Sequence, residues 1–159
     1  MFPEFFQAIG WVLLGMVLMG LIVWFVMPSM MLVTHKSRRG YAETLAALNE
    51  AVARKQGWKV LAVNDYQQAT APFAALEHVG SVNVCNARYA STILTSDKNR
   101  IVSAFMPLAV GVYEDKTGQV YVTEMNVGLM GRMFGGVIAK VMGMAGHDLD
   151  EMIATVTAK

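Results

Sequence analysis

Cysteine is almost absent from this chain, and its scarcity removes several classes of site. The 159 residues include one cysteine, Cys85, so an internal disulfide framework and a cysteine-only metal site are excluded. The sequence also lacks the His-x₃-His and Cys-x₂-Cys spacings of common metal sites. It has neither the Gly-x-Ser-x-Gly elbow of many hydrolases nor the lysine and serine spacing of a P-loop. We therefore predict no catalytic residues and no metal, and the sequence favours a role other than catalysis.

Excess charge of one sign is missing as well. The formal net charge is +1, which gives no global electrostatic case for binding nucleic acid. Basic residues do gather at Lys36, Arg38 and Arg39. Each basic residue near an anionic bilayer is attracted by about 1 kcal/mol, so we expect this cluster to contact the membrane surface.

One long segment contains no charged residue. The run from Ile9 to Met27 would form a helix of roughly 28 Å, which just spans a hydrocarbon core of about 30 Å. Trp11 and Trp24 lie near its ends, where tryptophan prefers to sit, and Pro28 is expected to end the helix. We predict a transmembrane helix at about 9–27 within an N-terminal segment 1–29, followed by a domain at 30–159.

Two other interpretations of the apolar run fit less well. A cleaved signal peptide needs a basic region before the run and a small-residue cleavage site after it, but only Glu4 precedes it and Pro28-Ser29-Met30-Met31 follows. A buried helix of a soluble domain would not be apolar on every side over this length. The positive-inside rule then predicts a single-pass membrane protein with its domain in the cytoplasm. Alternatively, the basic residues at 35–39 serve the domain's first strand and turn.

Residue patterning predicts an α+β domain, with helices packed on a mostly antiparallel sheet. Apolar residues at three- and four-residue spacing predict a helix over 41–56, capped by Ser37 and ended by Gly57. The clearest hairpin pattern joins strands at 108–113 and 119–124. The other expected elements are strands at 30–34, 58–64 and 79–85, a helix at 87–95 capped by Asn86, a polar loop at 96–99, a helix at 126–143, a break at Gly146 and a helix at 148–157.

Several short motifs in the domain resemble the domain-of-unknown-function family 302. In chain order they are Gly57-Trp58-Lys59-Val60, Val84-Cys85-Asn86-Ala87-Arg88-Tyr89-Ala90, Met106-Pro107-Leu108-Ala109-Val110, Val112-Tyr113-Glu114 with Gly118, and Glu124-Met125-Asn126. The resemblance covers roughly residues 31–157. It implies a compact α+β fold, commonly paired into dimers, and no established reaction. Bacterial relatives with the Val84–Ala90 version look like those found beside sulfur-oxidation functions, which suggests a link to sulfur metabolism by analogy. The resemblance also implies that the predicted membrane is a bacterial inner membrane.

The sequence departs from this family at two positions. Family members often have proline where this chain has Ala87, and cysteine where it has Leu108. The second departure removes a possible thiol partner for Cys85.

Three residues are candidates for ligand or redox chemistry. Cys85 follows a predicted strand and precedes a helix N-terminus, which can lower a thiol pKa, so it could be a reactive or ligating thiol. The alternative is an apolar cysteine in the core. His78 lies seven residues earlier, on the opposite face of a regular strand, and His35 is the third candidate. Haem needs only one or two axial ligands and stays open, but the sequence identifies no cofactor.

Small residues recur every fourth position near the C-terminus, at Gly131, Gly135, Ala139 and Gly143. Glycine in a helix costs roughly 0.8–1.0 kcal/mol relative to alanine, so we expect close contact with another helix or backbone. That contact could be with the domain's own sheet, a second subunit or a flat ligand. The leading hypothesis is a membrane-tethered binding or accessory subunit, either oligomeric or attached to a larger membrane complex. The alternative is a redox or haem-binding protein that uses Cys85 or a histidine.

Overall fold

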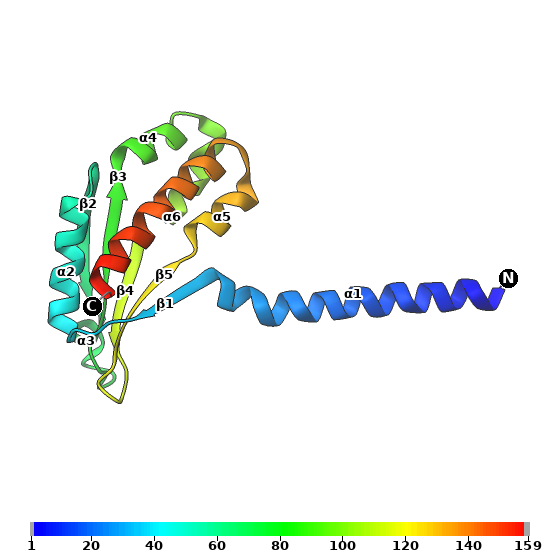
Figure 1. Cartoon of the computed structure of the whole chain (residues 1–159), viewed down its shortest axis with the longest axis horizontal. Helices are drawn as coiled ribbons and strands as arrows, with labels where there is room; N and C mark the ends of the chain where they lie inside the picture. The colour runs from blue at the N-terminus through cyan, green and yellow to red at the C-terminus, as the bar shows by residue number, and fades with distance from the viewer. Residues whose placement is uncertain (1, 158–159) are drawn as a thin grey trace. The chain divides into compact units, whose positions relative to one another are not determined.

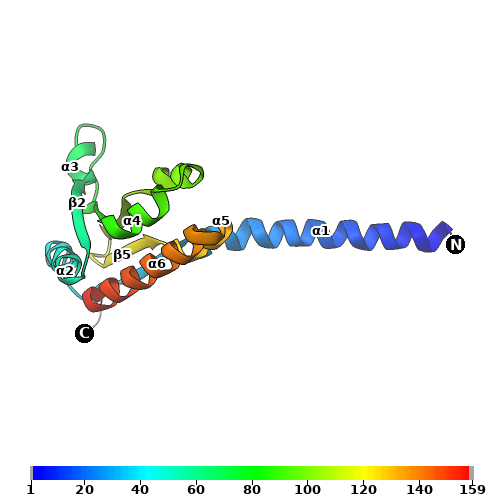
Figure 2. The same cartoon turned by 90° about the horizontal axis from the view of Figure 1, so that it is seen from above.

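The structure is a computed structural model that describes residues 2–157, and these residues form two compact units (Figures 1 and 2). The first ends at Leu32 and the second begins at Val33. The boundary lies close to the predicted division between the N-terminal segment and the domain.

The first unit is the helix α1 (Phe2–Met31). Its segment Ile9–Met31 has a mean hydropathy of 2.5, with no part of it buried, so it is long and apolar enough to cross a membrane. A signal sequence near an N-terminus can have the same properties. The predicted end at Pro28 is wrong, because Pro28 lies inside the helix. Proline removes one N–H group, and the Ser29 hydroxyl donates to the Val26 carbonyl oxygen at 2.7 Å in the same turn.

The second unit is the predicted α+β domain, built on a five-stranded sheet in the order β1-β5-β4-β3-β2. The pairs β2–β3, β3–β4 and β4–β5 are antiparallel. The strands are β1 (Leu32–Lys36), β2 (Trp58–Asp65), β3 (Val79–Asn86), β4 (Leu108–Glu114) and β5 (Val120–Met125). The helices are α2 (Tyr41–Arg54), α3 (Tyr66–Thr70), α4 (Ala87–Leu94), the 3₁₀ segment η1 (Asp97–Phe105), α5 (Val127–Phe134) and α6 (Gly136–Thr157).

The core forms where α2 and α6 pack on the sheet (Figure 1). Successive strand residues point to opposite faces, and alternate positions of β3, β4 and β5 are buried valines, among them Val82, Val110 and Val122. Val110 pairs with Val82 on one side and with Glu124 on the other, so these side chains share the helix-covered face. Leu48 of α2 and Ile153 of α6 are fully buried. Helices on a largely antiparallel sheet confirm the predicted fold class.

The start of the domain differs in detail from the prediction. The expected strand at 30–34 begins later, at Leu32, because α1 continues through Met31. The predicted cap Ser37 does not cap α2, whose N-cap is Gly40. The Ser37 hydroxyl lies 2.7 Å from the Thr44 hydroxyl, and both side chains are buried. Ser37 therefore ties the loop to the second turn of the helix instead of its first.

The prediction of one continuous helix at 126–143 is wrong, because two helices cover this range. The small residues expected on one face of that helix therefore do not share a face. The chain breaks at Gly135 and Gly136, whose φ angles are +68° and +56°, a region that side-chain-bearing residues rarely adopt. Gly131 therefore belongs to α5, while Ala139 and Gly143 belong to α6.

Close packing between α5 and α6 explains two glycines near this break. A Cβ on Gly131 would lie 2.6 Å from Met142 Cβ, and a Cβ on Gly146 would lie 3.1 Å from the Gly128 nitrogen. The expected break at Gly146 is absent, since α6 runs through it to Thr157. The close approach predicted for the small residues thus occurs within the domain at Gly131. Its role between subunits stays a prediction.

Candidate functional site

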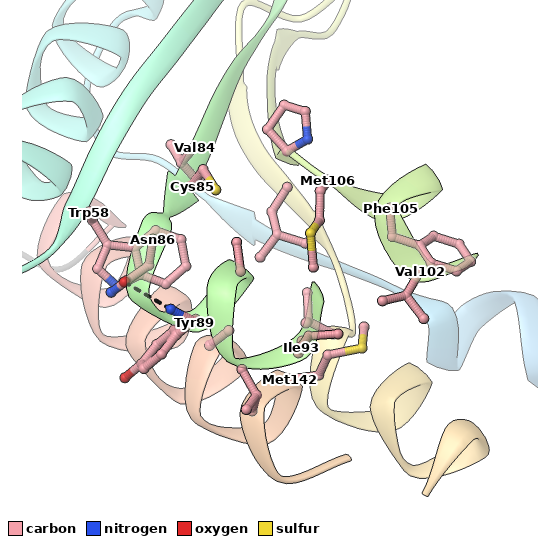
Figure 3. A pocket seen from close by; sticks show the side chains of 16 residues that line it. Trp58, Val84, Cys85, Asn86, Tyr89, Ile93, Val102, Phe105, Met106 and Met142 are labelled. Carbon is pink, nitrogen blue, oxygen red and sulfur yellow. Dashed lines mark hydrogen bonds between the residues drawn. The ribbon is translucent and has the colours of Figure 1, made fainter. Parts of the chain in front are cut away.

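An apolar pocket of about 50 Å³ lies between the ends of β3 and β4 and the helical segments α4, η1 and α6 (Figure 3). Figure 3 shows Met106 on one side of it and Ile93 and Met142 on the other. Its wall contains the aromatic, thioether and aliphatic side chains of Trp58, Tyr89, Ala90, Ile93, Val102, Phe105, Met106, Pro107, Leu108, Val127, Val141, Met142 and Ala145, together with Val84, Cys85 and Asn86. One water molecule needs roughly 10–15 Å³ measured in this way, so the pocket holds a molecule of a few heavy atoms.

The pocket brings together three of the five motifs on which the family resemblance rests. Three of the motifs, those around Trp58, Cys85 and Pro107, lie far apart in the sequence, yet each contributes to the wall. The register of the sheet explains this, because Trp58 pairs with Asn86 and Val84 pairs with Leu108. The sequence could not reveal the pocket, since it depends on the pairing of three strands.

Asn86 fixes the geometry at the edge of the pocket. As predicted, it caps α4, and its side-chain oxygen accepts hydrogen bonds from the backbone nitrogens of Arg88 at 3.1 Å and Tyr89 at 3.3 Å. Gly57 lies against it with φ +80°, and a Cβ there would be 3.0 Å from Asn86 Nδ2. Both the backbone conformation and the available space therefore require glycine at this turn.

A cluster around Asp148 holds the aromatic wall in place. Asp148 accepts hydrogen bonds from Trp58 Nε1 at 2.9 Å and from the Tyr89 hydroxyl at 3.1 Å, and it pairs with Lys55 Nζ at 3.0 Å. The rings of Trp58 and Tyr89 meet edge to face, with centroids 6.1 Å apart. Burial opposes ionisation of Asp148, but the bonds from Trp58, Lys55 and Tyr89 outweigh it and lower the pKa. The charged carboxylate thus joins β2, α4 and α6.

Cys85 is half-buried in the pocket wall. Burial raises the pKa of its thiol, so the thiol is protonated at neutral pH and is a weak nucleophile. The geometry suits contact with a ligand better than attack on one.

The histidines are not placed beside Cys85. His78 lies just before β3, at the end of the strand far from Cys85, and its ring stacks on Tyr41 with centroids 4.9 Å apart. His35 lies on β1, the edge strand at the other side of the sheet. Among residues 2–157, no three His, Cys, Asp or Glu side chains are grouped so that they could hold a metal ion.

A buried carboxyl group lies away from the pocket, on β5. Glu124 is 4% exposed, and its Oε1 has no hydrogen-bond partner, with His35 Nε2 3.7 Å away. Burial, and then the charge and hydrogen bond of Asp150 on α6, raises the pKa of Glu124 to about 8. The alternation of Val120, Val122 and Glu124 is the signal in the sequence that places Glu124 on the buried face of the strand. Glu124 is named above only within a family motif.

The basic cluster lies at the opposite end of β1 from the start of the domain. The Lys36 ammonium sits over the Tyr121 ring, 5.9 Å from its centroid. Arg38 and Arg39 are exposed beside an open groove that also includes Gly118 and Gln119 of the hairpin. Their contact with a membrane stays a prediction.

Comparison with known proteins agrees with the geometry of the domain. The sequence model described as "Domain of unknown function DUF302" matches residues 33–156. A crystal structure of an uncharacterized conserved DUF302 protein from Bacillus stearothermophilus superposes with a TM-score of 0.70 at 19% sequence identity. The alignment covers 80% of this chain and 98% of that chain. No curated protein matches the sequence significantly.

Proposed function

This chain belongs to the DUF302 family, and we propose that it is a membrane-tethered binding module that holds a small apolar or sulfur-containing ligand in the pocket beside Cys85. The observation that carries the proposal is the convergence of three of the five family-like motifs on that pocket. Hydrogen bonds made by Trp58, Asn86 and Tyr89 hold the wall of this pocket in place. The tether is supported by the length and hydropathy of Ile9–Met31.

The chemistry of the wall favours a soft, apolar ligand. The wall is aliphatic and aromatic, with the sulfur atoms of Cys85, Met106 and Met142 around it. Thioethers and thiols are polarizable and apolar, and thioethers make favourable contacts with aromatic rings. A small sulfur compound would match this wall. This match is the physical basis of the proposed link to sulfur metabolism.

The redox or haem alternative has less support. The pKa of Cys85 is raised, whereas a redox thiol usually has a lowered one. A pocket of about 50 Å³ is too small for a porphyrin ring unless the surrounding helices move apart. Self-association, or attachment to a larger membrane complex as an accessory subunit, stays part of the proposal. The close contact at Gly131 is made between α5 and α6 within one domain, so it does not support self-association.

Binding can be tested on the full chain in lipid nanodiscs, with ¹³C-labelled methionine methyl groups as reporters. We expect xenon and dimethyl sulfide to shift the signals of Met106 and Met142 in a saturable way. A stronger response to dimethyl sulfide would support a sulfur ligand, and a response to xenon alone would support a purely apolar one. The absence of any saturable shift would contradict the proposal.

Two alanine variants provide the matched control. Ala90→Leu places a larger side chain in the pocket wall and should remove the saturable shift. Ala109→Leu makes the same change at an exposed position of β4 outside the pocket, and should leave binding intact. Thermal melting of both variants shows whether the fold is retained.

A further inference from the structure

The corner between α5 and α6 exposes apolar side chains and basic ones together. Met133 is 67% exposed, Phe134 44% and Val137 39%. Arg132 and Lys140 are exposed beside them in the sequence. No Asp or Glu occurs between Val127 and Gly146. Large exposed apolar side chains surrounded by charge of one sign are typical of surfaces that bind another phase or molecule.

These side chains form one surface because of how the corner is built. Met133 and Phe134 end α5, and Val137 follows the two glycines that turn the chain. Along α6, Val137, Lys140 and Met144 recur at intervals of three and four residues, which places them on one side of the helix. Met144 is 40% exposed. The pattern is that of an amphipathic helix at an interface, with an apolar strip and cationic residues beside it.

The corner lies on the end of the domain at which the chain enters it. Val33 is the first residue of the domain, and its carbonyl oxygen accepts a hydrogen bond from the Thr123 hydroxyl at 3.1 Å. Thr123 is near the end of β5, and α5 begins at Val127. Figure 1 shows α5 leaving the end of β5 beside β1. The apolar segment Ile9–Met31 therefore connects to the domain at the end from which α5 projects.

The basic cluster at Lys36–Arg39 lies at the other end of the same strand pair. The backbone nitrogen of Ser37 donates to the Val120 carbonyl oxygen at 2.8 Å, and Val120 is the first residue of β5. At about 3.3 Å per residue, the two ends of β5 are roughly 17 Å apart. This exceeds the screening length of about 8–10 Å at physiological salt. The α5–α6 corner lies at the end where the apolar segment joins the domain, so it is better placed than the Lys36–Arg39 cluster for contact with a bilayer.

We propose that the α5–α6 corner docks on an anionic lipid bilayer. Met133, Phe134 and Val137 enter the boundary between headgroups and acyl chains, and Arg132 and Lys140 meet the headgroup phosphates. The inference rests on the tether of the proposed function, because a tethered domain meets the bilayer at a high effective concentration. It does not depend on the pocket or its ligand.

The test uses the full chain in nanodiscs of phosphatidylcholine and phosphatidylglycerol, with a gadolinium chelate on a small share of the headgroups. We expect the ¹³C-methyl signals of Met133 and Met144 to broaden strongly, and the signal of the buried Met152, two turns further along α6, to broaden less. The broadening should decrease in phosphatidylcholine alone and at high salt. Equal broadening of all three signals would overturn the proposal.

Charge reversal separates the two basic surfaces. Arg132→Glu with Lys140→Glu should remove the excess broadening at Met133 and Met144, and the matched pair Arg38→Glu with Arg39→Glu should leave it. The opposite outcome, or no effect of either pair, would overturn docking through the corner. Carbonate extraction of the same chains from liposomes of the same lipids tests the tether separately. An extracted chain contradicts the proposed function, and the methyl comparison still judges the corner.

Discussion

Glu124 places a carboxyl group in the interior of the domain, where water does little to stabilise its charge. From the elements packed around it, His35 of β1 and Asp150 of α6 face the group, and Val110 of β4 lies opposite it in the sheet. Burial is the main reason why its pKa rises from 4.5 to about 8. The folded chain therefore binds this proton more tightly than the unfolded chain does.

This difference predicts how stability depends on pH. The contribution of Glu124 is fully present below about pH 4.5, where both states hold the proton, and is lost as pH rises to about 8. The slope is at most about 1.4 kcal/mol per pH unit. Glu124→Gln removes the titration, so the variant should gain stability relative to wild type as pH increases across this range. Urea unfolding of the full chain in detergent, at several pH values, measures the difference.

Glu50→Gln is the matched control for that experiment. Glu50 is 63% exposed and pairs with Arg54 at the helix surface, where an ion pair contributes little. The free energy of unfolding of the Glu50→Gln variant should follow that of the wild type at every pH. A constant difference between wild type and Glu124→Gln would show that the buried carboxyl titrates normally.

At the scale of elements, regular patterns were predictable and the break between α5 and α6 was not. The hairpin strands β4 and β5 follow their alternation within a residue of the expected bounds. The apolar periodicity, by contrast, continues across Gly135 and Gly136, so it gives no sign that both adopt positive φ. Gly146 looked like a break but is retained inside α6, because it allows Gly128 to approach closely. A tertiary contact therefore explains the glycine at position 146, whereas the break at 135–136 rests on the backbone conformation of the two glycines.

The element α1 carries the second prediction. A chain beginning near Ser29 lacks the apolar segment and should lose integral membrane association. Residual binding through basic residues should persist only at low salt. Sedimentation of membranes after carbonate treatment measures this, with the full chain as the control. If the shortened chain resists extraction as the full chain does, α1 is not the anchor.

At the scale of the whole molecule, the pocket could be found only in the tertiary structure, whereas the long apolar segment could be found in the sequence. Trp58, Cys85 and Met106 meet only because β2, β3 and β4 pair in register. The sequence identified Cys85 as a candidate for its helix N-terminus, whereas the structure gives it a place in an apolar wall. The long apolar segment, in contrast, is visible in the sequence because its length and hydropathy are local properties of the chain, and they can be compared directly with the thickness of a bilayer.

Orientation is the third prediction. The basic residues after the apolar segment predict a cytoplasmic domain. A reporter that is active only in the cytoplasm should therefore be active when fused after Lys159. The same fusion with a reporter that works only in the periplasm should be silent, and activity there would contradict the predicted orientation.

The contact between Phe105 and Phe134 joins the pocket to the α5–α6 corner. Phe105 lines the pocket, Phe134 belongs to the corner, and their ring centroids are 6.0 Å apart. With the corner docked on lipid, an apolar solute dissolved among the acyl chains would be separated from the pocket wall by this one aromatic contact. The rate of binding would then scale with the solute's concentration in the lipid, and hence with its partition coefficient between membrane and water, while the occupancy at equilibrium would still be set by its free aqueous concentration.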